Sequence, residues 1–388
     1  MKLALLGPAA IAVLGLAGCG VFGKDEPVDP PAELTEFERS LEIERVWRAE
    51  VGDTDPVLRL GLVAATDGSR VYAAAHDGQV AAYDAVTGER AWVAETELPL
   101  SAGPAVGDGV VALGSTDGDL IALEAEDGAS RWHIRVGSEI LAAPVVGRGI
   151  VVAQTVDGRL RAFDAANGSE IWEVEQTVPA LSLRGGASPV IAGDAVLAGF
   201  ANGHLLAVSL AEGDELWDTL ISPSSGRTVL ERLVDINSAV QVVGDDVYVV
   251  NFQGRVTALA LESGQVLWAR ELSSHRGLGV DLASVYITTE LSEVVALDRR
   301  GGDTRWSQES MLRRELTAPV PFGRAVVVGD LEGYLHWLSP DTGELIGRMH
   351  AGDASISGRP LAAGERLFVL TDAGELTAYI VERAPEGD

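Results

Sequence analysis

The sequence has little that could support disulfide, metal or redox chemistry. Cysteine occurs once in 388 residues, at Cys19. A single thiol excludes an intramolecular disulfide, a cysteine-based metal site and a vicinal redox pair. The six histidines have no H-x-x-x-H spacing, and no G-x-S-x-G elbow, phosphate loop or G-x-G-x-x-G motif occurs. The sequence therefore offers no familiar catalytic, metal-binding or nucleotide-binding motif.

Positive charge is also scarce. The chain has 58 acidic and 29 basic side chains, a formal net charge of −29, and its only lysines are Lys2 and Lys24. A strongly anionic surface repels phosphate backbones and acidic lipid headgroups. This balance disfavours nucleic acid as a partner, and it disfavours binding to a membrane through surface charge.

Apolar sequence at the N-terminus is short. The run from Leu3 to Gly15 is uncharged over thirteen residues, which is too few for a membrane span and typical of a secretory signal. It ends in Leu16-Ala17-Gly18-Cys19, which resembles the lipobox of bacterial lipoproteins. That resemblance implies a signal peptide of residues 1–18 and acylation of Cys19. Because Gly20 replaces the Asp that retains lipoproteins in the inner membrane, it also implies an outer-membrane anchor facing the periplasm.

Residues 19–42 are predicted to be a lipidated N-terminus and flexible tether. The segment contains Pro27, Pro30 and Pro31 among acidic residues and has little apolar content before Leu41. An extended chain of this length spans tens of Å. We expect it to separate a folded domain from the membrane.

The chain does contain a repeat, which is clearest from His76 to Trp92. Asp77-Gly78 is a hairpin signal and predicts a type I′ turn with positive φ at both residues. Gln79 to Asp84 alternates as a strand does. A second turn at Gly88 then leads into a strand that ends in the large apolar side chain of Trp92.

Eight copies of this repeat align on the hairpin glycine, at intervals of 38 to 51 residues, with Ser292 replacing it once. Four residues later seven copies have alanine, and only Trp337 departs. Small residues permit close approach of a neighbouring sheet, and a repeated tryptophan fills the gap between sheets. Fourteen residues after the hairpin position, six copies have tryptophan: Trp92, Trp132, Trp172, Trp217, Trp268 and Trp306.

This period, with four short strands per copy, is typical of a β-propeller. The eighth copy, Asp372 to Ile380, ends before its tryptophan, whereas Glu44 to Trp47 matches Glu89 to Trp92. We therefore expect an all-β fold over residues 43–381: an eight-bladed β-propeller of four-stranded antiparallel blades, closed by the N-terminal strand completing the last blade. Residues 382–388 are predicted to be a disordered tail.

Two connections between predicted blades are longer than the others. One contains residues 181–186, Leu-Ser-Leu-Arg-Gly-Gly, and the other runs from Ser222 to about Ser238. Loops on a rigid scaffold commonly carry recognition, so Leu181, Leu183 and Arg184 are candidate partner contacts. The alternative is that both leucines begin the inner strand of blade four and are buried.

The lipobox, the tether and the repeat G-x-L-x-A-x-D-x-x-x-G-x-x-x-W together resemble the BamB family of outer-membrane assembly lipoproteins, within the quinoprotein-like (PQQ-repeat) propeller class. The stretch from Leu181 to Gly185 is similar to the loop by which that family docks on BamA, the barrel-inserting partner. The second connection resembles a family Asp-x-Asp motif, in which Asp235 matches and Asn237 replaces the second acid. That replacement keeps an acceptor and loses a charge.

The resemblance implies a non-enzymatic scaffold of the outer-membrane β-barrel assembly (BAM) complex, without a cofactor. Its expected partners are a periplasmic POTRA domain of BamA, other lipoproteins of the complex and unfolded outer-membrane proteins. The expected contacts to BamA are Leu181, Leu183, Arg184, Asp235 and Asn237.

Two alternatives belong to other functional classes. A quinoprotein dehydrogenase of the same fold class would hold pyrroloquinoline quinone and a metal on the axis, and such enzymes commonly use a vicinal cysteine pair that this chain lacks. The repeat acids Asp84, Asp164 and Asp298 are expected to cap turns instead of binding metal. A periplasmic ligand-binding or sensor propeller would need exposed aromatic clusters, and aromatic residues make up only 5% of the chain.

Overall fold

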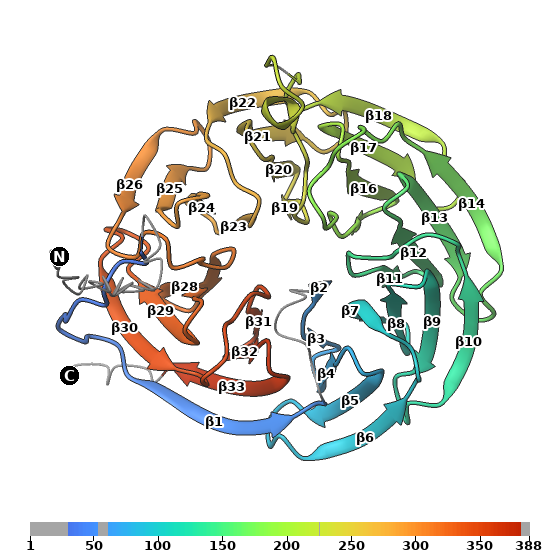
Figure 1. The fold of residues 1–388 in the computed structure, drawn as a ribbon, viewed down its shortest axis with the longest axis horizontal. Coiled ribbons are helices and arrows are strands. Elements are labelled where there is room, and N and C mark those ends of the chain that lie inside the picture. Colours follow the sequence, from blue (N-terminus) through green and yellow to red (C-terminus); the bar gives the residue numbers. More distant parts are fainter. Residues whose placement is uncertain (1–29, 53–60, 225, 382–388) are drawn as a thin grey trace, which may run out of the picture. The chain divides into compact units, whose positions relative to one another are not determined.

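Eight β-sheets follow one another around a common axis in the unit that begins at Pro31 (Figure 1). The computed structural model describes residues 30–52, 61–224 and 226–381. Each sheet runs from a strand near the axis to a strand at the outer edge. The prediction of an all-β, eight-bladed propeller with four-stranded antiparallel blades is confirmed.

The first four blades each begin with the strand nearest the axis and continue outward. Blade one has β3 (Ala65–Thr66), β4 (Arg70–Ala74), β5 (Gln79–Asp84) and β6 (Arg90–Glu95). Blade two has β7 (Leu100–Gly107), β8 (Val110–Ser115), β9 (Asp119–Glu124) and β10 (Ser130–Arg135), with β2 (Gly61–Leu62) added parallel to β7. Blade three has β11 (Val145–Gly147), β12 (Ile150–Gln154), β13 (Arg159–Asp164) and β14 (Glu170–Glu175). Blade four has β15 (Val190–Ala192), β16 (Ala195–Gly199), β17 (His204–Ser209) and β18 (Glu215–Leu220).

The last four blades follow the same order. Blade five has β19 (Gln241–Val243), β20 (Asp246–Val250), β21 (Arg255–Ala260) and β22 (Val266–Glu271). Blade six has β23 (Leu278–Val280), β24 (Ser284–Thr288), β25 (Val294–Asp298) and β26 (Thr304–Gln308). Blade seven has β27 (Val320–Phe322), β28 (Ala325–Gly329), β29 (Tyr334–Leu338) and β30 (Leu345–His350). Blade eight has β31 (Leu361–Ala363), β32 (Arg366–Leu370), β33 (Glu375–Val381) and β1 (Ile43–Glu50).

The N-terminal strand closes the ring, as predicted from the last strand missing in the eighth repeat. β1 pairs antiparallel with β33, from Ile43 opposite Val381 to Glu50 opposite Glu375. Trp47 then links blade eight to blade one, because its indole Nε1 donates to the carbonyl oxygen of Ala85 at 3.3 Å. β1 therefore supplies the outermost strand of blade eight, so the edge of β33 is paired.

The repeated alanine, glycine and tryptophan form one packing unit. Trp92 lies opposite Ala82 in the neighbouring strand, and its Nε1 donates to the carbonyl oxygen of Ala125 in the next blade at 3.0 Å. A Cβ at Gly128 of that blade would lie 2.6 Å from the indole ring. Glycine is therefore required there by the close approach and by its φ of +76°. The same bond to the next blade is made by Trp132, Trp172, Trp217, Trp268 and Trp306.

The prediction of a type I′ hairpin at Asp77-Gly78 is wrong. Gly78 has a φ of +100°, but Asp77 does not adopt positive φ. The N–H of Ala75 donates to the carbonyl oxygen of Gln79 at 2.9 Å, which closes a longer loop with one left-handed glycine. Asp77 instead accepts the N–H of Gln79 through its side chain at 3.0 Å. The aspartate is favoured at this position as a cap of the turn.

The repeat acids at the second turn are caps, as predicted. Asp84 Oδ1 accepts the backbone N–H groups of Thr87 and Val86 at 2.8 and 2.9 Å, and these bonds lower the pKa of its carboxyl. Asp164 and Asp298 accept equivalent bonds in blades three and six.

The N-terminal segment meets the propeller earlier than the sequence suggests. The predicted tether extends to residue 42, but the N–H of Ala32 already donates to the carbonyl oxygen of Leu312 at 2.9 Å. The predicted signal peptide at 1–18, the lipidation site at Cys19 and the tail at 382–388 lie outside the described residues. Within the part that is described, no helix has the length and apolar character to cross a membrane.

Candidate partner-binding loops

The two long connections lie on the same face of the ring. Neighbouring strands of an antiparallel blade alternate in direction, so the second-to-third-strand turns and the connections between blades share one face. One long connection joins β14 to β15, and the other joins β18 to β19 and contains the 3₁₀ turn η1 (Leu230–Arg232). We call this face the loop face.

The first loop is exposed and irregular. Leu181 is 41% exposed, Ser182 is exposed and Leu183 is half-buried. The inner strand of blade four begins only at Val190. The alternative that both leucines begin that strand and are buried is therefore wrong.

Asp235 connects the second loop to the first. Its Oδ1 accepts the backbone N–H of Leu183 at 2.8 Å, and its side chain is completely buried. The N–H of Phe252 in blade five donates to the carbonyl oxygen of Asp235 at 2.9 Å. The structure thus places Asp235 below the surface, where it positions Leu183, and not among the exposed side chains.

Burial raises the pKa of Asp235, and the hydrogen bond from Leu183 opposes that shift only in part. Among the described residues, Oδ2 of Asp235 has no hydrogen-bond partner. A buried carboxylate with one unsatisfied oxygen costs free energy. The residue therefore holds the loop in place at some expense to stability.

Arg184 and Asn237 lie at the border of the same surface. The guanidinium of Arg184 is exposed, and its Nη2 lies 3.6 Å from Oε2 of Glu139 on the connection between β10 and β11. An exposed pair of this kind contributes only about 0–1 kcal/mol. Asn237 is half-buried and faces the first loop near Gly185. Arg184 is thus available to a partner at little cost, whereas Asn237 is partly covered.

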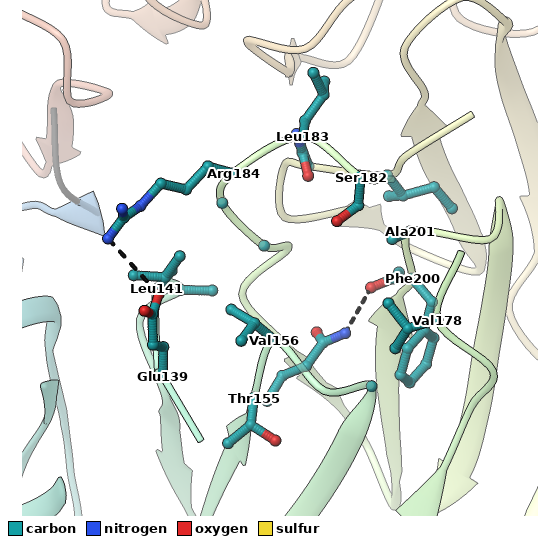
Figure 2. A pocket seen from close by; sticks show the side chains of 18 of the residues that line it. Glu139, Leu141, Thr155, Val156, Val178, Ser182, Leu183, Arg184, Phe200 and Ala201 are labelled. Carbon is teal, nitrogen blue, oxygen red and sulfur yellow. Dashed lines mark hydrogen bonds and ion pairs between the residues drawn. The ribbon is translucent and has the colours of Figure 1, made fainter. Parts of the chain in front are cut away.

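A cavity of about 310 Å³ lies beneath the first loop. Figure 2 shows Arg184 reaching across its mouth toward Glu139, with Val156, Val178 and Phe200 around the interior. Oε1 of Gln154 is buried without a hydrogen-bond partner in the described residues, while its Nε2 donates to the carbonyl oxygen of Gly199 at 2.9 Å. The first loop therefore covers a cavity lined by both apolar and polar side chains.

Sequence reasoning missed Phe200 and Gln154, although one signal was available for the phenylalanine. Phe200 stands three residues before the hairpin glycine of its repeat. The other copies have small or polar residues there: Ala75, Ser115, Thr155, Asn251, Thr289, Asp330 and Thr371. Gln154 lies on an ordinary strand position and gave no comparable signal.

The second loop also exposes two apolar side chains. Val229 and Leu230 are 56% and 64% exposed. The carboxylate of Glu231 accepts the N–H groups of Arg227 and Thr228 at 2.6 and 3.2 Å, which lowers its pKa. These bonds fix the short turn, so the exposed leucine and valine are held in place.

The described acids and histidines do not form a metal site. Across residues 30–52, 61–224 and 226–381, no three Asp, Glu, His or Cys side chains are grouped in a way that could hold a metal ion. The two long loops present the exposed side chains of Leu181 and Leu230, the exposed guanidinium of Arg184, and a cavity with a mixed polar and apolar lining.

Comparison with known proteins identifies the family. The family model described as outer membrane protein assembly factor BamB matches residues 76–308 and 292–383. The protein of that name from Pseudomonas aeruginosa is 45% identical over 373 residues, covering 96% of this chain and 98% of the relative. That from Escherichia coli K12 is 34% identical over 389 residues, covering 98% and 99%.

Solved structures agree with this assignment. The crystal structure of BamB from Moraxella catarrhalis is similar with a TM-score of 0.81 and 26% identity, covering 87% of this chain and all of that one. A quinohemoprotein alcohol dehydrogenase from Comamonas testosteroni has a TM-score of 0.67 at 14% identity, covering 89% and 78%, and shares the fold alone. The chain belongs to the family of outer membrane protein assembly factor BamB.

Proposed function

We propose that this protein is a scaffold lipoprotein of the BAM complex, which assists the folding and insertion of β-barrel proteins into the outer membrane. Relatives that match nearly the whole chain are named outer membrane protein assembly factors. The partner is a periplasmic POTRA domain of BamA, and the binding surface is the loop face. Other BAM lipoproteins and unfolded barrel proteins are its further partners.

The observation that carries the binding proposal is the bond between Asp235 and the backbone of Leu183. It ties together two loops that lie 52 residues apart in the chain, so their exposed side chains form one surface fixed before binding. A fixed surface loses less conformational entropy when a partner docks. Leu181 and Arg184 supply the apolar and charged contacts, and Asn237 borders them.

We propose that the protein performs no catalysis and needs no cofactor. The chain has one cysteine, Cys19, so the vicinal pair of related dehydrogenases cannot form. The central acids of the repeat serve as turn caps, as Asp84 does. This proposal predicts that the purified protein neither binds pyrroloquinoline quinone nor turns over alcohols with an artificial electron acceptor.

We further propose a lipid anchor on Cys19 that holds the protein at the periplasmic side of the outer membrane. The lipobox-like residues 16–19 and the absence of Asp after Cys19 support it. Labelling cells with radioactive palmitate should mark the protein, and Cys19→Ser should lose the label. A labelled Cys19→Ser variant would contradict this anchor.

Binding to purified BamA POTRA domains, measured by calorimetry, tests the partner. Leu181→Glu and Arg184→Glu should each weaken binding by at least tenfold, because a misplaced charge in a desolvated contact costs several kcal/mol. The thermal midpoint should remain unchanged, because both side chains are exposed.

The matched control is Leu282→Glu, since Leu282 is 87% exposed in the β23–β24 turn on the opposite face. It should bind as the parent does. Unaltered affinity in both loop variants would reject the surface, and equal loss in the control would point to a general effect of added negative charge.

A further inference from the structure

The segment from Ala32 to Leu41, which we call the strap, crosses the outside of blade seven. At one end, the N–H of Ala32 donates to the carbonyl oxygen of Leu312 at 2.9 Å. At the other end, the N–H groups of Ser40 and Leu41 both donate to the carbonyl oxygen of Ile346 at 3.1 Å. Figure 1 shows this dark-blue segment outside β30 before it enters β1.

A buried charged group receives the first end of the strap. Arg314 is 2% exposed, and its Nη1 donates to the carbonyl oxygen of Ala32 at 3.0 Å. The same guanidinium donates through Nε to Oδ2 of Asp330 at 2.7 Å and pairs with Glu332. Asp330 is the only acid at its place in the eight repeats. Asp330 is therefore not a feature of the repeat pattern. Arg314 joins this charged group to the strap through its Nη1 hydrogen bond.

A second arginine holds the middle of the strap. Arg348 Nη1 donates to the carbonyl oxygen of Thr35 at 2.9 Å, and its guanidinium lies 5.0 Å from the centre of the Phe37 ring. Its Nε donates to Nδ1 of His336, and His336 Nε2 donates to Asp330. One connected set of hydrogen bonds therefore links both contacts of the strap.

Blade seven also exchanges the sizes of two repeat positions. Trp337 stands where seven copies have alanine, and Gly347 stands at the tryptophan position. A Cβ at Gly347 would lie 2.6 Å from Cδ1 of Ile43 and 3.6 Å from Cβ of Leu41. The space that a tryptophan fills in other blades is thus occupied by the end of the strap and the start of β1.

The strap changes the face from which the N-terminal chain departs. β1 begins at Ile43 opposite Val381, where β33 ends, and third strands such as β33 end at the face opposite the loop face. Ala32, in contrast, contacts Leu312 on the β26–β27 connection and Arg314 beside the β28–β29 turn. Both of those segments belong to the loop face. Without the strap, the chain would leave from the other side.

We propose that the strap is a built-in orienting element that directs the lipid-anchored N-terminus out of the loop face, so that this face is held toward the bilayer. The proposal rests on the lipid anchor proposed above for Cys19. Twelve residues separate Cys19 from Ala32, so the reach to the membrane is at most about 40–45 Å. The partner of the N-terminal segment is the lipid bilayer, and the protein attaches to it only through the acyl chains on Cys19.

Hydrogen exchange on the full-length protein tests whether the strap is docked. Phe37→Ala and Arg348→Met should each raise the exchange rates of the Ala32, Ser40 and Leu41 amides at least tenfold, because each removes a contact that holds the strap. Arg324→Met is the matched control, since Arg324 is exposed on the β27–β28 turn. Strap amides that exchange as fast in the parent as in both variants would overturn the proposal.

Energy transfer to vesicles tests the orientation. The acylated protein is bound to vesicles of phosphatidylethanolamine and phosphatidylglycerol that carry a headgroup acceptor. A donor dye is attached through Leu291→Cys or Leu282→Cys, two exposed positions on opposite faces of blade six. Because acylation consumes the thiol of Cys19, the new thiol is the only one available for labelling.

We expect higher transfer from position 291 than from position 282, and we expect Phe37→Ala to reduce that difference by at least half. Equal transfer in vesicle-bound parent protein would overturn the orienting role while leaving the anchor intact. Failure of the acylated protein to bind vesicles would overturn the anchor, and the orienting role with it.

Discussion

The loop face at blades three to five and the charged group of blade seven depart from the repeat at the same place, three residues before the hairpin glycine. In blade four that residue is Phe200, which lines an open cavity. In blade seven it is Asp330, which is buried in a charged group that the strap covers. In both places, a residue that departs from the repeat marks a site where something other than the neighbouring blades can bind. The site at Asp330 is covered by a segment of the same chain, the strap, whereas the cavity at Phe200 is open to an external partner.

The largest expected effect concerns closure of the ring. Trp47→Ala should lower the free energy of unfolding by about 3–5 kcal/mol, because it empties the contact between blades eight and one. Deleting residues through Trp47 should destabilise the protein further, since it also removes the strap. Urea denaturation measures both, with Val46→Ala at a partly exposed neighbour as the control. A truncated ring as stable as the parent would refute the closure.

The next effect compares one arginine from each region. Arg314→Met should cost about 3–5 kcal/mol of stability, because it removes the only guanidinium paired with the buried Asp330 among the described residues. Arg184→Met should cost less than about 1 kcal/mol, because its pair with Glu139 is exposed. Denaturation of both variants in one buffer gives the difference. Similar losses of stability in the two variants would show that the burial of the arginine does not determine what its ion pair contributes.

A smaller effect should appear on acidification. His336 accepts from Arg348 and donates to Asp330, so it is neutral in the fold, and burial lowers its pKa. A histidine with a lowered pKa contributes stability that is fully present above the unfolded-state pKa of about 6.5. That stability is lost as the pH falls from there through the lower pKa of the folded state. The parent should lose stability relative to His336→Gln by up to about 1.4 kcal/mol per pH unit in that window. Parallel pH profiles would contradict this reasoning.

The smallest effect has the opposite sign and concerns Asp235. Burial raises the pKa of the Asp235 carboxyl. Its contribution to the free energy of unfolding is therefore fully present only below the unfolded-state pKa of about 3.9, and it is lost as the pH rises through the higher pKa of the folded state. Asp235→Asn keeps an acceptor for the Leu183 N–H and should gain about 1 kcal/mol at pH 7. That gain should vanish near pH 4.

Affinity for BamA separates positioning from direct contact at Asp235. Asp235→Asn should bind as the parent does, whereas Asp235→Ala should bind more weakly because Leu183 loses its anchor. Calorimetry with POTRA domains compares the two variants. Weak binding by Asp235→Asn would instead indicate that a partner uses the negative charge.

The sequence predicted the ring well because each repeat position has a local physical reason. Ala82, Gly128 and Trp92 can be placed by size alone, and the missing last strand predicts its replacement by β1. The turn at Asp77-Gly78 was mispredicted because a capping aspartate and a left-handed residue share the same sequence preference.

The site was predicted only in part, because its organisation depends on contacts between distant segments. Leu181 and Arg184 could be found as loop residues, but the burial of Asp235 follows from its contact with a loop 52 residues away. The strap was hidden for the same reason. Residues 31–42 look like a linker in composition, and the residues that bind them, such as Arg314 and Arg348, lie about 300 positions later.

Site-specific photo-crosslinking in cells tests the central claim most directly. A photoreactive amino acid at position 184 should crosslink to the POTRA region of BamA, and one at position 282 on the opposite face should not. Crosslinking to BamA from position 282, or from neither position in cells that assemble β-barrels normally, would contradict docking through the loop face.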